Sequence, residues 1–236
     1  MCKSNSNPPW LDEQQPHDEQ RSAAQIAALV EMLGPDTKRV LDLGCGAGRV
    51  LVPLAEAGHD VTGVDRNEEV LAICRQRLDE CGRSARLLRD DFLEDWPALD
   101  GTFDAVCLLG NTIMTVAEID DAVRLMQRIG TVLGEDGVLV IDDCPGDFWP
   151  ELTEGNWTSG ISEDGSAQLL WEEDDAVFAL RFGDEVDAEC WRFKPTDRLC
   201  RLWTFGALRL TTRLAGLSDP TRVADGGLLT ARRATV

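Results

Sequence analysis

Three glycines and an aspartate lie close together near residue 45, in a spacing that suits a nucleotide-like ligand. The segment VLDLGCGAGR occupies residues 40–49. Apolar residues lead into the aspartate and an apolar helical pattern follows from Val50, so we expect a buried strand, a tight turn and the start of a helix. Glycine lets the backbone approach a ligand closely because it has no Cβ. This turn is therefore the candidate binding loop.

A carboxylate ends the next apolar run. Val61–Asp65 reads as a short strand, and Asp65 stands 21 residues after Gly44. An acid at this strand end can accept hydrogen bonds from two ribose hydroxyls, which favours an adenosine-containing ligand. The alternative is that Asp65 caps the following helix together with Asn67.

The glycine spacing decides between ligand classes. A dinucleotide fingerprint G-x-G-x-x-G would need glycine at position 49 or 51, where the chain has Arg49 and Leu51. The pattern is instead D-x-G-x-G-x-G. It resembles the first motif of the class I S-adenosylmethionine-dependent methyltransferases, and the resemblance covers residues 40–143 best.

The resemblance implies a site for S-adenosylmethionine at the ends of the first four strands. Asp42 would face the amino group of the donor, and the three glycines would surround its middle. An acid after the third strand would meet the adenine amino group; we assign it to Asp91, with the Phe92 amide on a ring nitrogen, while Asp90 could exchange roles with Asp91. The implied donor-binding residues are Asp42, Gly44, Cys45, Gly46, Gly48, Asp65, Arg66, Asp91, Phe92, Leu109 and Gly110.

Asn111 is the candidate catalytic residue. Ligands of open α/β sheets lie outside the carboxyl ends of strands, so Asn111 falls where the transferring methyl group would be. The sequence Leu-Gly-Asn-Thr at residues 109–112 resembles the matching loop of small-molecule N- and O-methyltransferases. The alternative is a turn in which Asn111 caps the next helix.

Alternating helical and strand patterns predict the elements that position these residues. Helices are expected at 18–33, 50–57, 67–81 and 119–133, and strands at 40–43, 61–65, 85–88, 103–109 and 138–143, with a turn at 134–137. The implied fold is α/β: a doubly wound, mostly parallel, seven-stranded, Rossmann-like sheet in one domain over 1–236. An arm at 1–17 precedes the first helix.

Beyond residue 143 the pattern changes to short alternating runs, which are typical of antiparallel hairpins. They lie at 168–171, 176–182, 190–193 and 199–203. We expect a β lid at 148–204, inserted between the fifth strand and a last helix at 206–216, with strands at 217–223 and 228–232 completing the sheet. Its tryptophans could form an aromatic pocket for an amine acceptor or only the core of the lid. They are Trp149, Trp157, Trp171, Trp191 and Trp203. Asp142, Asp143 and Asp147 could contact substrate or solvent.

The amino-acid composition restricts the classes of binding partner that we expect. The 236 residues carry a net charge of −20, which repels nucleic acid and anionic membranes, so we expect a small-molecule methyl acceptor instead. Eight cysteines without C-x-x-C pairs, and no run of 18 apolar residues, predict reduced thiols, no metal site and a cytoplasmic monomer or homodimer.

The sulfonium of S-adenosylmethionine is already an activated electrophile, so positioning should suffice for N- or O-methylation. The alternatives are a non-catalytic S-adenosylmethionine-binding protein and a transferase that moves another group from an S-adenosyl donor.

Overall fold

The computed structural model describes residues 19–94, 99, 102–144, 146, 153–155, 158–223 and 226–234. The expected arm at 1–17 lies outside the described residues. So do Asp147, Trp149 and Trp157.

The larger sheet confirms the predicted doubly wound α/β fold. Its seven strands follow the order β10-β11-β5-β4-β1-β2-β3, and β11 runs antiparallel to both β5 and β10 while the other neighbours are parallel. The order reverses beside β1, so a crevice opens there at the carboxyl ends of β1 and β4. The strands are β1 Arg39–Leu43, β2 Asp60–Asp65, β3 Arg86–Arg89, β4 Phe103–Leu108, β5 Leu133–Asp142, β10 Thr221–Arg222 and β11 Leu228–Arg232.

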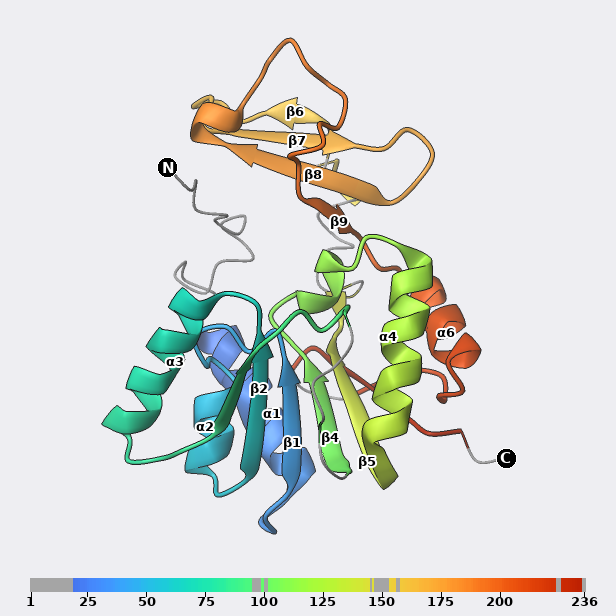
Figure 1. Ribbon diagram of the computed structural model, residues 1–236. Helices are drawn as coiled ribbons and strands as arrows, with labels where there is room; N and C mark the ends of the chain where they lie inside the picture. The colour runs from blue at the N-terminus through green and yellow to red at the C-terminus, as the bar shows by residue number, and fades with distance from the viewer. Residues whose placement is uncertain are drawn as a thin grey trace.

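Helices cover both faces of this sheet because its strands are apolar on both sides (Figure 1). Alternate residues of β5 show the division: Val138 and Val140 pack with α1, α2 and α3, whereas Leu139 and Ile141 pack with α4 and α6. The helices are α1 Glu19–Leu33, α2 Leu51–Glu56, α3 Glu68–Glu80, α4 Ile119–Val132 and α6 Phe205–Leu214.

A separate antiparallel sheet lies above the carboxyl ends of the parallel strands (Figure 1). Its order is β6-β7-β8-β9. These strands fall inside the predicted range 148–204 and run β6 Gly160–Ile161, β7 Ala167–Trp171, β8 Val177–Phe182 and β9 Leu199–Arg201. The short 3₁₀ helix η2 Gly183–Glu185 follows β8. The base of the sheet joins the main core, because Phe178, Cys200 and Trp203 pack in one buried cluster with Leu41 and Ile141.

Three local predictions were wrong. Residues 190–193 form no strand; they are a loop whose carbonyls accept hydrogen bonds from Arg181. The turn expected at 134–137 is part of β5, which begins at Leu133 opposite Phe103 and absorbs the extra residues in an irregular register. The expected strand 217–223 is interrupted: Leu217 forms an isolated antiparallel bridge with Arg233, and the strand itself is only Thr221–Arg222, because Pro220 between them has no N–H to donate to a ladder.

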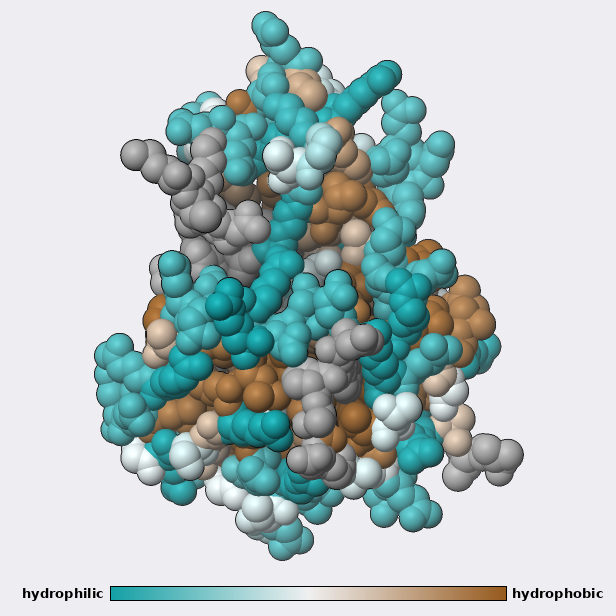
Figure 2. Space-filling model, viewed as in Figure 1, coloured by the Kyte–Doolittle hydropathy of each residue, from teal (hydrophilic) through white to brown (hydrophobic). Residues whose placement is uncertain are grey.

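The visible surface is largely hydrophilic, with an apolar area at the edge where α6 lies (Figure 2). Leu210 and Leu214 of α6 are each 57% exposed. Among the described residues, no helix combines the length and the apolar character needed to cross a membrane.

Candidate functional site

A cavity of about 680 Å³ opens at the carboxyl ends of β1 to β4. Its volume falls in the range of small-molecule sites. The glycine turn contributes Gly44 and Gly46, and the end of β2 contributes Asp65 and Arg66. The structure thus brings together two segments that the sequence had assigned to one ligand.

The segments after β3 and β4 complete the cavity. Asp91 and Phe92 line it from one side, and Leu109 and Gly110 line it from another. Eight of the eleven predicted donor-binding residues therefore surround one space. Val70 of α3 adds an apolar wall that the sequence analysis had not assigned.

Gly44 has no room for a side chain. Its φ is +74°, which strains any other residue, and an added Cβ would lie 2.7 Å from Thr112 Cγ2 and 2.8 Å from Thr112 Oγ1. Thr112 opens the short 3₁₀ helix η1 Thr112–Thr115 after β4. The turn after β1 and the loop after β4 are thus in direct contact across the cavity floor.

Gly48 has a different reason to be glycine. An added Cβ would lie 2.7 Å from Cys74 Sγ of α3 and 2.8 Å from Val52 Cγ2 of α2, so Gly48 permits close helix packing. Gly48, Asp42 and Cys45 are not among the described residues that line the cavity. Asp42 and Cys45 are buried. Their assignment to the donor stays a prediction.

Asp65 ties the glycine turn to α3. Its Oδ2 accepts from the Gly46 N–H at 3.0 Å, and its Oδ1 accepts from the Asn67 N–H at 2.8 Å. Asn67, not Asp65, is the cap of α3, because Asn67 Oδ1 accepts from the Glu69 N–H at 2.9 Å. Each carboxylate oxygen accepts more than one hydrogen bond, so Asp65 retains capacity for ligand hydroxyls.

Asp90 and Asp91 both line the cavity. Asp90 Oδ1 accepts from the Asp91 N–H at 2.8 Å, and Asp91 Oδ1 accepts from the Leu93 N–H at 3.0 Å. Asp91 also lies 3.9 Å from Arg66 in an exposed ion pair, which contributes little to stability. The choice between the two acids for the adenine amino group therefore stays open.

Asn111 adopts the left-handed conformation, with φ 61° and ψ 17°. It stands at the cap position of η1, but its side chain makes no capping hydrogen bond. Its N–H donates to Asp142 Oδ2 at 2.6 Å, and its Oδ1 accepts from Cys144 Sγ at 3.6 Å. The described lining of the cavity does not include Asn111, so its contact with an acceptor stays a prediction.

Asp142 belongs to a buried polar network that the sequence analysis missed. Gln25 Nε2 of α1 donates to Asp142 Oδ1 at 2.7 Å, and Arg49 Nη1 donates to Gln25 Oε1 at 2.8 Å. Burial raises the pKa of Asp142, while Arg49 and the donors from Asn111 and Gln25 oppose the rise. The available signal was Gln25 itself, which shares the helix stripe of Leu29 and Leu33 at a spacing of four residues.

Both acids at the end of β5 are nearly buried and neither is in the described lining of the cavity, so solvent contact is small and contact with a substrate stays a prediction. Asp142 is 5% exposed, and Asp143 is 7% exposed and paired with Arg222 at 2.6 Å. Trp203 and Trp171 follow the packing alternative, whereas Trp191 is 46% exposed. Trp203 is fully buried and donates to Val116 O, and Trp171 packs on Phe178 with ring centroids 5.0 Å apart.

The cysteines give a direct test of burial. Burial raises the pKa of Cys107 and Cys144 well above the ordinary thiol value and raises the pKa of Cys200 to about 11. Only thiolates alkylate, so these three should resist iodoacetamide at pH 8, whereas the partly exposed Cys81 and Cys190 should react. Peptide mass mapping before and after denaturation checks this. Native labelling of Cys107 as fast as Cys81 would contradict the fold.

Comparisons with known proteins agree with this geometry. A family model described as a methyltransferase domain matches residues 40–137. The putative methyltransferase YqeM of Bacillus subtilis (strain 168) is 31% identical over 113 residues, covering 48% of this chain and 45% of YqeM. The dTDP-3-amino-3,6-dideoxy-alpha-D-glucopyranose N,N-dimethyltransferase of Streptomyces fradiae is 30% identical over 152 residues, covering 64% of this chain and 56% of that enzyme.

The chain spans about half the length of the curated relatives it matches. Among solved structures, the CcbJ methyltransferase from Streptomyces caelestis superposes with a TM-score of 0.66 at 19% identity, covering 94% of this chain and 100% of that chain. At this identity the likeness concerns the fold alone. It extends the agreement in fold well beyond residues 40–137.

Proposed function

We propose that this protein is an S-adenosylmethionine-dependent methyltransferase that transfers a methyl group to a nitrogen or oxygen atom of a small-molecule acceptor, because residues 40–137 match a family model of a methyltransferase domain. One observation carries the proposal: the glycine turn, Asp65 and Asp91, all from the matched segment, line a single cavity.

The residues present fit S-adenosylmethionine. Asp65 offers carboxylate oxygens to ribose hydroxyls, and Val70 and Phe92 offer apolar surface to a purine. Arg49 supplies a further observation, because its Nε is buried and has no hydrogen-bond partner among the described residues. An added Cβ on Gly110 would lie 3.5 Å from Arg49 Nη2, so this guanidinium stands behind the cavity wall. The carboxylate of the donor would be a suitable acceptor for this Nε–H.

The bound donor would supply a sulfonium-activated methyl group. The chain then has to hold the acceptor lone pair in line with that methyl group and keep water out. Such positioning can contribute about 7 to 11 kcal/mol to barrier reduction. We propose that the antiparallel sheet β6–β9 is the lid that excludes water, and that Asn111 contacts the acceptor.

Binding and turnover test the proposal in two steps. Isothermal titration with S-adenosylmethionine and S-adenosylhomocysteine should detect both ligands. A methyl-transfer screen over amines, phenols and carboxylates should then yield a methylated product. Binding without turnover on any acceptor class would favour a non-catalytic S-adenosylmethionine-binding protein. Absence of binding would overturn the proposed function.

Replacing Asn111 with glycine should separate its two proposed roles. Glycine keeps the left-handed backbone and the N–H to Asp142, but removes the side-chain amide. If that amide orients the acceptor, we expect kcat to fall by about tenfold or more while donor affinity stays within about twofold. Steady-state kinetics and titration measure the two quantities. An unchanged kcat would leave Asn111 as a turn residue only.

A further inference from the structure

The lid reaches into the donor cavity through two residues. Arg198 and Leu199, at the start of β9, line the cavity together with the strand ends of the larger sheet. Every other described lining residue lies before position 116. Whatever fills this cavity therefore meets the lid first at Arg198 and Leu199.

The charges around Arg198 identify which part of the cavity it faces. Its guanidinium is partly buried, and burial lowers the pKa of Arg198, with Arg66 acting in the same direction. Arg198 lines the same cavity as Asp65 and Asp91, and both carboxylates oppose this lowering of its pKa. These are the acids that we assign to the ribose and the adenine. Arg198 thus faces the adenosyl half of the site.

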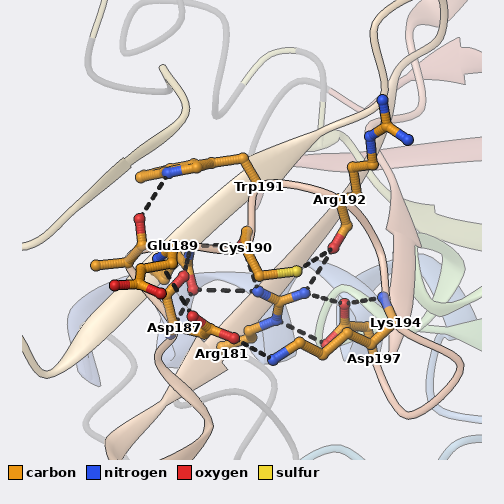
Figure 3. A network of polar contacts seen from close by, with 10 residues as sticks. Arg181, Asp187, Glu189, Cys190, Trp191, Arg192, Lys194 and Asp197 are labelled. Carbon is orange, nitrogen blue, oxygen red and sulfur yellow. Dashed lines mark hydrogen bonds and ion pairs between the residues drawn. The ribbon is translucent and has the colours of Figure 1, made fainter.

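The residue before Arg198 is held by a buried ion pair. Arg181 of β8 is 1% exposed, and its Nε and Nη2 donate to the two oxygens of Asp197 at 2.9 and 2.7 Å (Figure 3). The remaining donors of Arg181 reach the carbonyls of Cys190 and Arg192, each at 2.8 Å, and Gln168 Oε1 at 3.3 Å. A guanidinium is suited to this role because it offers five donors in a rigid plane.

The loop between β8 and β9 is fixed at further points. Buried Gln168 of β7 donates to the carbonyls of Asp187 and Cys190, at 2.9 and 3.2 Å. Lys194 donates its N–H to Asp197 Oδ2 at 2.7 Å and its Nζ to Asp187 Oδ2 at 2.7 Å (Figure 3). The loop that delivers Arg198 is therefore anchored to the lid sheet on both sides of the ion pair.

We propose that Arg198 is the contact of the lid with the adenosyl half of the donor, and that Arg181 positions Arg198 through Asp197. A guanidinium stacks well on a purine face and donates to ribose oxygens. The inference rests on the proposed function, because it takes the cavity to be the donor site. It adds that donor binding and lid placement are coupled through one side chain.

Titration calorimetry with S-adenosylhomocysteine and 5′-methylthioadenosine tests Arg198. The second ligand has the adenosyl half but lacks the amino-acid half. We expect Arg198→Ala to weaken both ligands by about tenfold. Arg192→Ala is the matched control, because Arg192 is an exposed arginine of the same loop. Its backbone carbonyl, which accepts a hydrogen bond from Arg181, is retained in the alanine variant. Both affinities should therefore stay within about twofold of wild type.

Every remaining outcome contradicts either the inference or the proposed function. Wild-type protein that binds neither ligand would refute the proposed function itself. If wild type binds and Arg198→Ala binds equally well or more tightly, the proposed contact does not exist. If only S-adenosylhomocysteine is weakened, Arg198 faces the amino-acid half, and if only the KM of the acceptor rises, it faces the acceptor; both results overturn the inference.

A double-mutant cycle tests the positioning role of Arg181. Arg181→Lys keeps the charge but loses the paired hydrogen bonds to Asp197. We expect it to weaken S-adenosylhomocysteine by about fivefold in the wild-type background and by less than about twofold when Arg198 is already alanine. Equal weakening in both backgrounds would show a merely structural role. Asp197→Asn provides the same cycle if Arg181→Lys does not fold.

Discussion

Gly44→Ala should abolish measurable donor binding. The substitution places a Cβ within 2.8 Å of two Thr112 atoms and forces a left-handed backbone on alanine. The strain alone costs about 1 to 3 kcal/mol. Relief of the overlap has to move either the glycine turn or η1, and both line the cavity. We therefore expect S-adenosylhomocysteine affinity to fall by about 100-fold or more, measured by titration calorimetry.

Gly82→Ala is the matched control for that experiment. Gly82 follows α3 with φ +66°, but an added Cβ would meet nothing within 4 Å. Both substitutions thus introduce a similar backbone strain, and only Gly44→Ala disturbs the cavity. We expect Gly82→Ala to lower the melting temperature without changing donor affinity. Equal affinities for the two variants would mean that the turn at Gly44 is remote from the donor.

Asp65→Ala should weaken donor binding at least tenfold. The substitution removes the proposed acceptor of the ribose hydroxyls, and it also frees the Gly46 and Asn67 N–H groups that hold the glycine turn against α3. Losing a charge-assisted hydrogen bond costs about 1.5 to 3 kcal/mol, which corresponds to at least about tenfold in affinity. Asp60→Ala, at the exposed start of the same strand, should leave affinity unchanged.

A modified ligand separates the two effects of Asp65. Wild type should bind 2′-deoxy-S-adenosylhomocysteine more weakly than the parent ligand, because one hydroxyl can no longer donate. In Asp65→Ala this difference should disappear, whereas damage to the turn alone would preserve it. A preserved difference would therefore place the ribose elsewhere, even if the overall affinity fell.

Most of the fold could be predicted from local patterns in the sequence. The first four strands of the larger sheet and the helices up to residue 132 are confirmed within one or two residues, because apolar periodicity and helix boundaries are properties of neighbouring residues. The same locality explains the glycine turn and the acid at the end of β2. Their spacing along the chain is fixed by the lengths of one strand, one turn and one helix.

Errors arose where a distant partner decided the conformation. Residues 190–193 alternate like a strand, yet the carbonyls of Cys190 and Arg192 accept hydrogen bonds from the buried guanidinium of Arg181 instead of pairing in a sheet. The expected turn at 134–137 was absorbed into β5 because Leu133 pairs with Phe103 thirty residues earlier. Neither partner is visible from the local pattern.

A nucleotide-like ligand, and the strand ends that would face it, could be predicted from the sequence alone, since turn chemistry and strand periodicity are local. Only the tertiary structure decided that Gly48 serves helix packing, that Asp142 is bound by Gln25 from 117 residues away, and that Arg198 enters the cavity from the lid. These contacts depend on how separate elements pack in space. Side-chain identity alone does not specify which of many buried polar groups will meet.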